Sequence, residues 1–220
     1  MKKILETTTI GSFPKPAYVP VQDWFDLSRK TGGMSTSQTT LDYTQDIEIN
    51  RSTHEGLFIR AAKQIIEIQN RAGISIPTDG EVRRENYIHY HCRYLDGFDF
   101  QNLEHQILRE GAYETDLPAI RSKIIHSRKP YSVHDYMAAQ GVSVNPVKFT
   151  LPGPMTIMDT TSDCYYNDRR ELNAALATTV NKEILSLAEA GCQYIQIDEP
   201  LFARNVNDAL DFGMEGLERC

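Results

Sequence analysis

The sequence predicts an α/β fold, a TIM-type (β/α)8 barrel that is incomplete in this chain, with about five of the eight strands. Short β-prone runs alternate with amphipathic helical segments, which is typical of parallel βαβ units. Several of these runs end in acidic residues, and such barrels hold their ligands at the carboxyl ends of the strands. Residues 1–220 are therefore predicted to form one domain with a ligand site at those ends.

The clearest strand lies near the carboxyl end of the chain, where residues 193–200 read Gln-Tyr-Ile-Gln-Ile-Asp-Glu-Pro. Its body is apolar and β-prone, as in a buried parallel strand. Because Pro200 cannot continue a central strand, Asp198 and Glu199 must stand at the strand's carboxyl end. We expect both acids to face a ligand; the alternative is that they only cap the turn or helix that follows.

The first predicted strand covers residues 7–10 and leads into the turn Gly11-Ser12-Phe13-Pro14. A glycine at this point lets the backbone approach a ligand closely, although an ordinary turn is the simpler reading. Residues 14–40 are then expected to be irregular, with the only tryptophan, Trp24, and a run of small polar residues over 31–40. A connection of that length is more often functional or mobile than architectural.

A helix and a second strand follow this connection. Apolar residues recur at helical spacing over residues 57–72, and Gly73 has the position of a helix C-cap. Residues 74–78 then form a short β-prone run that ends in Asp79, Gly80 and Glu81. The order strand, helix, strand with acids at the strand end is that of a βαβ unit, which places Glu81 beside the first turn.

The stretch 83–92 is dense in hydrogen-bonding side chains, and we expect it to form a polar, aromatic wall along a substrate cleft. Its candidate lining residues are Arg84, Tyr87, His89 and His91. In an extended segment His89 and His91 would face the same side, which suggests a metal site. Against that alternative, Cys92 would point the other way and no fourth ligand stands at a recognisable spacing.

The remaining segments continue the alternation and end before a barrel would close. Met155 and Thr156, which follow a stiff Pro-Gly-Pro turn, are further candidates for the cleft lining. An unclosed barrel exposes an edge strand, so either this is part of a longer product or another chain, such as a second copy, covers the gap. The segments are strand 119–125, helix 133–140, strand 146–151, turn 152–154, helix 172–188 and helix 206–217.

Composition excludes several classes of protein. A formal net charge of −7 argues against nucleic acid or an anionic membrane as a partner. No apolar run approaches the ~20 residues of a membrane helix, and the first residues lack the apolar core of a signal peptide. The 4 cysteines are widely spaced, which fits reduced thiols in a cytoplasmic protein better than a disulfide framework.

Four motifs occur in order: Thr-Ile-Gly-Ser-Phe-Pro at 9–14, Asp-Gly-Glu at 79–81 followed by Arg83, Arg84 and Tyr87, Leu-Pro-Gly-Pro-Met-Thr at 151–156, and Ile-Gln-Ile-Asp-Glu-Pro at 195–200. Together they resemble the catalytic C-terminal domain of cobalamin-independent methionine synthase. The resemblance runs from residue 7 to about residue 200. This family shares a barrel superfamily with uroporphyrinogen decarboxylases and thiol alkyltransferases.

The resemblance implies a methyltransferase of the 5-methyltetrahydropteroyltriglutamate–homocysteine S-methyltransferase type, which makes methionine from homocysteine and a methylated folate. It also implies zinc, because a free thiol with a pKa near ~8.5 is mostly protonated at neutral pH and coordination removes the proton. Ile10, Gly11 and Ser12 match the segment that holds the homocysteine carboxylate. Glu81 and Asp198 match the acids that hold its ammonium group.

The zinc ligands of the family do not carry over to this chain. They are a His-x-Cys pair after the following strand, then a glutamate and a cysteine, and would be expected beyond Cys220. His91 and Cys92 lack the intervening residue, and Cys220 has no histidine two residues before it. Two other readings therefore stay open: another zinc-dependent thiol alkyltransferase or a decarboxylase on the same barrel, and a truncated, catalytically silent paralogue that binds a ligand or partner.

Overall fold

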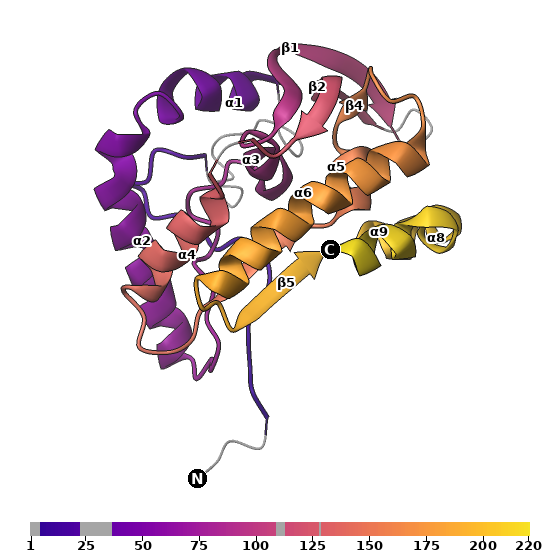
Figure 1. Ribbon diagram of the computed structural model, residues 1–220. Helices are drawn as coiled ribbons and strands as arrows, with labels where there is room; N and C mark the ends of the chain where they lie inside the picture. The colour runs from indigo at the N-terminus through magenta and orange to yellow at the C-terminus, as the bar shows by residue number, and fades with distance from the viewer. Residues whose placement is uncertain (1–4, 23–36, 109–112, 128) are drawn as a thin grey trace.

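The computed structural model of the chain describes residues 5–22, 37–108, 113–127 and 129–220. Helices and strands alternate along much of this length (Figure 1). The predicted α/β class is therefore confirmed. The elements are α1 (Ser37–Asp42), the π-helical turn η1 (Tyr43–Ile47), α2 (Arg51–Arg71), α3 (Tyr87–Cys92), β1 (Asp96–Leu108), β2 (Tyr113–Ile125), α4 (Tyr131–Gln140), β3 (Lys148–Pro152), α5 (Pro154–Asp159), β4 (Ser162–Asp163), α6 (Arg169–Glu189), β5 (Tyr194–Asp198), α7 (Leu201–Arg204), α8 (Val206–Asp208), the π-helical turn η2 (Ala209–Gly213) and α9 (Met214–Arg219).

Four parallel segments lie side by side in the middle of the molecule. Residues 7–8 come first and pair in parallel with Ile76. Lys148 at the start of β3 donates its backbone N–H to the carbonyl of Pro77 (2.9 Å), and β3 pairs in parallel with β5 over all of its residues. The carboxyl ends of the four segments therefore meet at one end of the molecule, as the sequence predicts.

Both long helices that lead into these segments end in the same way. Gly73 after α2 and Gly191 after α6 have φ of +85° and +84°, a conformation that suits glycine. The residue after each glycine donates its backbone N–H five residues back into the helix, to Gln69 after α2 and to Leu187 after α6. This helix C-terminal motif turns the chain sharply into the next strand, so α2 and α6 pack along the segments that they precede.

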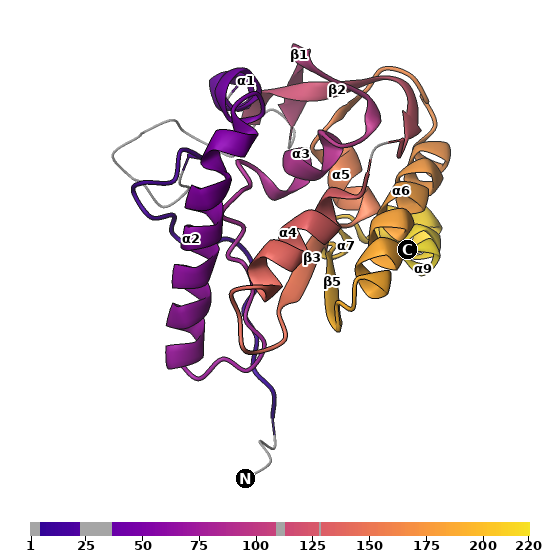
Figure 2. The ribbon, with the colours of Figure 1, turned by 60° about the vertical axis from the view of Figure 1, so that its left-hand side comes forward.

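The helices agree with the sequence prediction in position, with one exception. The segments 133–140 and 172–188 fall within α4 and α6, and the segment 57–72 falls within α2 except for its last residue, which caps the helix. The helices α2 and α6 flank the molecule on opposite sides (Figure 2). The predicted helix 206–217 is divided among α8, η2 and α9. Of the predicted irregular stretch 14–40, α1 occupies the end from Ser37, and residues 23–36 with Trp24 lie outside the described residues.

The predicted strand 119–125 is confirmed as a strand, but it does not join the parallel set of the expected barrel. It belongs to β2, which pairs antiparallel with β1 and parallel with β4 in a separate sheet. Neighbouring strands joined by a short connection pair at little cost in loop entropy. β1 has a polar sequence and a break in register around Gly97, whose φ is +104°, so no clean alternation marks it as a strand.

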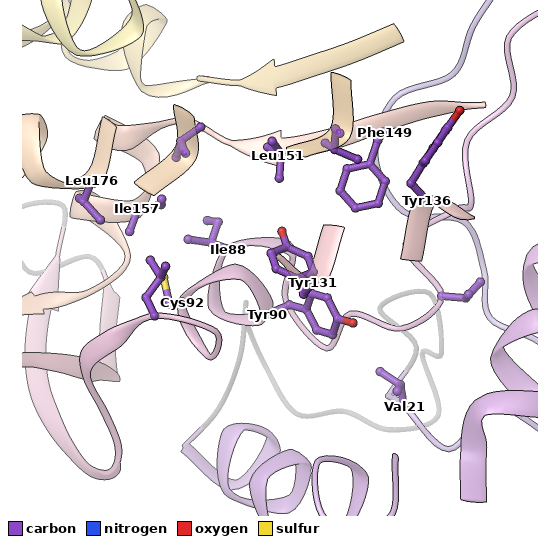
Figure 3. Packing of buried hydrophobic residues seen from close by; sticks show 14 of the residues in the cluster. Val21, Ile88, Tyr90, Cys92, Tyr131, Tyr136, Phe149, Leu151, Ile157 and Leu176 are labelled. Carbon is purple, nitrogen blue, oxygen red and sulfur yellow. The ribbon is translucent and has the colours of Figure 1, made fainter. Parts of the chain in front are cut away.

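The hydrophobic core extends over most of the described elements, and its aromatic part lies between β3 and the helices α3 and α4. Phe149 and Leu151 on β3 face Ile88, Tyr90 and Tyr131, and all five side chains are buried (Figure 3). Tyr131 packs against Tyr90 with ring centroids 5.3 Å apart and against Phe149 at 6.4 Å. This aromatic layer fixes α3, and with it the loop that carries Glu81, against the carboxyl half of β3.

A buried carboxylate joins the outer helices to this core. Glu183 of α6 accepts hydrogen bonds from the Ser132 hydroxyl at the start of α4 and pairs with His126 Nε2 at 2.7 Å. Its side chain is fully buried. Buried carboxylates are costly without partners, so this pair of contacts holds α6 in one position relative to α4 and β2.

Within the described residues β5 pairs on one side only, with β3, so a closed eight-stranded barrel is not shown. None of the described helices is both long and apolar enough to cross a lipid bilayer.

Candidate functional site

A cavity of about 700 Å³ opens at the carboxyl ends of the parallel segments. Its position is the one that the strand-end acids predict. All five residues predicted to bind substrate line it, and so do Tyr87 and Glu199 from the predicted cleft lining. The structure thus places these residues together, and their roles toward a ligand stay predictions. The wall consists of Ile10, Gly11, Ser12, Glu81, Asn86, Tyr87, Gln196, Ile197, Asp198, Glu199 and Pro200.

Glu81 stands on a tight turn with an unusual backbone. Its φ is +57°, and that of Gly80 before it is +69°. A side-chain-bearing residue in this left-handed region is uncommon and strained unless its surroundings hold it there. The Gly80 carbonyl accepts from the Phe13 N–H (3.0 Å), and the Glu81 N–H donates to the Asp79 carboxylate (3.0 Å). These two hydrogen bonds hold the turn in its conformation. Strained backbone of this kind is common at functional sites, where it orients a side chain toward a ligand.

The Glu81 carboxylate is held from two other segments. It accepts hydrogen bonds from the Ser12 hydroxyl (2.5 Å) and from the Thr150 hydroxyl of β3 (3.3 Å). Arg84 Nη1 lies 3.6 Å from the same carboxylate and donates to the Thr150 carbonyl at 3.1 Å. The two strand-end loops and β3 are therefore joined through this one carboxylate.

Arg84 does not line the cavity, and this expectation was wrong. Its side chain is only 2% exposed and stacks over the Phe149 ring at 5.0 Å. A cation buried at this depth needs negative partners, which Glu81 and Asp79 supply. Arg84 thus does not face a ligand; it is the buried positive charge that stabilises the buried Glu81 carboxylate.

Asp198 approaches the cavity from β5. Gln196, on the same face of the strand, donates from its side-chain Nε2 to Asp198 Oδ1. Burial raises the pKa of Asp198; the bond from Gln196 lowers it and the nearby Glu81 charge raises it further. A cationic ligand between the two acids would stabilise both in the ionised form. The pair is therefore suited to an ammonium group.

Met155 and Thr156 also lie beneath the cavity rather than along it, so this expectation was wrong. Both are buried, and they hold Glu199: the Thr156 hydroxyl donates at 2.5 Å and the Met155 N–H at 3.0 Å. The Glu199 carboxyl occupies the space that a side chain at Gly153 would need. Burial raises the pKa of Glu199. Glu199 is thus locked in place at the start of α5.

His89 and His91 are core residues, and their prediction as cleft lining was wrong. The segment is the helix α3, not an extended strand, because the Asn86 side chain caps it by accepting the N–H groups of residues 88 and 89. Successive helical residues turn by about 100°, so the two imidazoles diverge. His89 contacts the Thr160 carbonyl (3.0 Å) and His91 the Tyr131 hydroxyl (3.2 Å).

These two buried histidines make stability depend on pH. Burial lowers the pKa of His89 to about 4 and that of His91 to about 3. The unfolded chain takes up these protons below about pH 6.5 while the folded chain does not, so stability falls as pH drops from there toward about 3. We expect His91→Gln to reduce this slope by up to ~1.4 kcal/mol per pH unit, measured by urea unfolding.

The control for that experiment is His105→Gln, at an exposed position on β1. A slope that is the same in wild type and His91→Gln would contradict the assignment of His91 as a buried neutral group.

The described residues do not fit a metal ion. They contain no group of three or more histidine, cysteine or acidic side chains placed to hold one. Cys92 is fully buried in α3, and burial raises the pKa of its thiol. Burial likewise raises the pKa of Cys220 to about 12. The metal alternative for the stretch 83–92 is thus not supported by the structure.

The sequence model of the family described as "Cobalamin-independent synthase, Catalytic domain" matches residues 5–210. The chain belongs to this family. It is 32% identical over 218 residues to the methionine synthase of Saccharolobus solfataricus, covering 99% of this chain and 59% of that one. It is 29% identical over 198 residues to the methionine synthase of Sulfolobus acidocaldarius, covering 90% and 52%. The chain therefore spans a little over half the length of these curated relatives.

Solved structures agree with this membership of the cobalamin-independent synthase family. A B12-independent methionine synthase from Shewanella sp. W3-18-1, in complex with selenomethionine, matches with a TM-score of 0.76 and 26% identity over 98% of this chain and 57% of that chain. A putative vitamin-B12 independent methionine synthase from Listeria monocytogenes matches with a TM-score of 0.56 and 22% identity, over 76% and 49%. The second likeness concerns the fold alone.

Some cavity residues of this family member were missed by the sequence prediction. Gln196 could have been found, because residues two apart in a strand share a face and Asp198 was already placed. Asn86 carried the signal of a helix N-cap. Ile197 and Pro200 were quoted only as parts of the strand and its end. No local signal shows that Lys148 reaches Gln196 from the neighbouring strand (2.6 Å).

Proposed function

We propose that the chain binds homocysteine in the cavity and presents its thiol to a methyl donor, so that methionine is formed. One observation carries the proposal: Glu81 and Asp198, from different strand ends, face the same cavity as the Gly11-Ser12 turn. Membership of the cobalamin-independent synthase family supports it. So do the relatives named methionine synthase and the matched synthase structure that holds selenomethionine, a close analogue of the product.

The cavity wall offers complementary groups to the two ends of an amino acid. The acids Glu81 and Asp198 would hold the ammonium group through charge-assisted hydrogen bonds. Gly11 has a φ of +77°, and the backbone N–H groups of Gly11 and Ser12 make no hydrogen bond within the described residues. These groups, with Ile10 beside them, would hold the carboxylate. The thiol would then extend into the remaining volume, which exceeds that of an amino acid.

The other parts of the proposal rest on the family. The methyl donor would be a methylated folate, and zinc would supply deprotonation of the thiol when bound. Its ligands would lie outside the described residues, since these hold no metal-binding group. The residues would form one barrel-type domain in the cytoplasm. A second copy could cover the open edge of β5, whereas nucleic acid and membrane are not expected as partners of a chain with a net charge of −7.

The proposal is tested by calorimetric titration of the full chain with L-homocysteine and with 4-mercaptobutyrate, which keeps the carboxylate and thiol but lacks the ammonium group. We expect homocysteine to bind about 100-fold more tightly, since a hydrogen-bonded ion pair contributes about 1.5–3 kcal/mol. Equal affinities, or no binding of homocysteine, would contradict the proposal. An activity assay separates the two alternatives. Alkylation of another thiol but not of homocysteine would favour a different thiol alkyltransferase, and homocysteine binding without turnover would favour a silent paralogue.

A further inference from the structure

A chain of polar side chains runs from β3 to the Asp198 carboxylate. Lys148 Nζ donates to the side-chain carbonyl of Gln196 on β5, at 2.6 Å. The amide nitrogen of the same Gln196 donates to Asp198 Oδ1. Lys148 is 6% exposed and Asp198 faces the cavity, so the chain connects a buried cation to the edge of the site.

The direction of this chain is fixed by the chemistry of its first member. A side-chain amide can turn over, because its oxygen and nitrogen ends have nearly the same size. An ammonium group can only donate, so Lys148 must face the oxygen of Gln196. The nitrogen of Gln196 is then forced toward Asp198, where it meets an acceptor. With Lys148 removed, the amide could turn its oxygen toward Asp198, and two acceptors would face each other.

The same ammonium group also contacts the segment that precedes the Gly11-Ser12 turn. Lys148 Nζ donates to the Thr9 carbonyl at 2.7 Å. Thr9 directly precedes the segment Ile10-Gly11-Ser12, which lines the same cavity as Asp198. One buried cation thus ties the first segment to β5 across β3, and the spacing between the two halves of the site depends on it.

We propose that Lys148 is a positioning residue of this site, which orients Gln196 so that Asp198 keeps one oxygen bound and offers the other to a ligand. The inference rests on the proposed function for the identity of that ligand, an amino acid with a free ammonium group. Within the described residues Asp198 Oδ2 receives no hydrogen bond, so this oxygen is the one left for the cavity. Lys148 does not line the cavity; it acts through its hydrogen bonds to Gln196 and Thr9, and its charge also lowers the pKa of Asp198 directly.

The test compares Lys148→Met, which removes both the charge and the N–H donors, with Lys148→Gln, which removes the charge but keeps two N–H donors. Two quantities are measured in each: the dissociation constant of L-homocysteine as a function of pH, and the pKa of Asp198 from carboxyl ¹³C NMR of the ligand-free protein. Asp198→Asn assigns the resonance. Lys63→Met, at an exposed position on α2, is the matched control.

We expect Lys148→Met to weaken homocysteine about tenfold, the effect of one hydrogen bond to a charged group. The pKa of Asp198 should rise, because Gln196 no longer reliably donates and because the lysine charge that lowers this pKa is lost. The pH below which homocysteine binding is lost should rise with it, and both shifts should be smaller in Lys148→Gln, which loses only the charge. The dissociation constant of homocysteine in Lys148→Gln should stay within about threefold of the wild-type value. Lys63→Met should change neither quantity.

An unchanged Asp198 pKa in Lys148→Met would overturn the inference, even if affinity fell. An equal rise of that pKa in Lys148→Met and Lys148→Gln would also overturn it, because both variants lose the charge that lowers the pKa and only Lys148→Gln keeps N–H donors. If Lys148→Met does not fold, Gln196→Met takes its place, with the same expected rise and the same contrary result. If wild type binds no homocysteine, the proposed function fails on its own. The NMR titration of the ligand-free protein then still decides whether Lys148 controls Asp198.

Discussion

Asp198→Asn is expected to weaken homocysteine binding by about 100-fold and to leave thermal stability nearly unchanged. Asparagine keeps the size of the side chain, so packing at the end of β5 is retained. Gln196 still points a donor at position 198, so the new amide must turn its oxygen toward Gln196 and its nitrogen toward the cavity. The ligand ammonium would then meet a donor in place of a carboxylate.

Calorimetric titration and a thermal melt of the same preparation measure the two quantities. Asp116→Asn, which removes an exposed acid paired with His105 on the β1–β2 hairpin, is the matched control for loss of one negative charge. A variant that loses stability while its folded fraction binds homocysteine as wild type does would show that Asp198 is structural.

Arg84→Met is expected to destabilise the fold by about 3–5 kcal/mol at neutral pH. The substitution keeps much of the apolar volume over the Phe149 ring, so loss of charge is the main change. Glu81 and Asp79 are both buried, and without the guanidinium they would face each other unpaired. A carboxylate in that position is costly, so protonation becomes the cheaper state.

This variant also has a characteristic pH dependence. Burial already raises the pKa of Asp79 above its ordinary value, and the Arg84 charge opposes that rise. Without Arg84 the pKa of Asp79 in the folded state rises further. A carboxyl group with a raised folded-state pKa stabilises the fold at pH values below its unfolded-state pKa, and this stabilisation is lost as the pH increases through the folded-state pKa. The stability deficit should therefore shrink as the solution is acidified.

Urea unfolding at about pH 7 and about pH 5 measures the deficit in each condition. Arg71→Met, at an exposed position near the end of α2, controls for the loss of a surface arginine. A deficit below about 1 kcal/mol, or one that grows at lower pH, would show that Arg84 is not the counter-charge of the two acids.

The strand-end acids could be predicted from sequence because their signal is local. Pro200 ends the strand β5, which is half-buried and not fully buried as predicted, and fixes Asp198 and Glu199 at its tip. Glu81 follows a short strand that a long amphipathic helix precedes. Parallel strands share one carboxyl end, so separate local predictions combine into one site without knowledge of contacts. The same reasoning placed α2, α4 and α6 correctly.

The remaining features depend on contacts between segments far apart in the chain. Whether Arg84 faces the cavity or the core is decided by Phe149 and Thr150 on β3, which no nearby residue reveals. The prediction for His89 and His91 is wrong because it assumes an extended segment with a period of two, whereas the segment is a helix capped by Asn86. The link from Lys148 to Asp198 likewise exists only after β3 and β5 pair.

The central claim is that the tips of neighbouring parallel strands converge on one amino-acid ligand. A crystal structure of the chain with L-homocysteine tests it most directly. We expect the ammonium group between Glu81 and Asp198, and the carboxylate at the backbone N–H groups of Gly11 and Ser12. Homocysteine bound elsewhere on the molecule, or bound in the cavity with its ammonium group away from both acids, would contradict the claim.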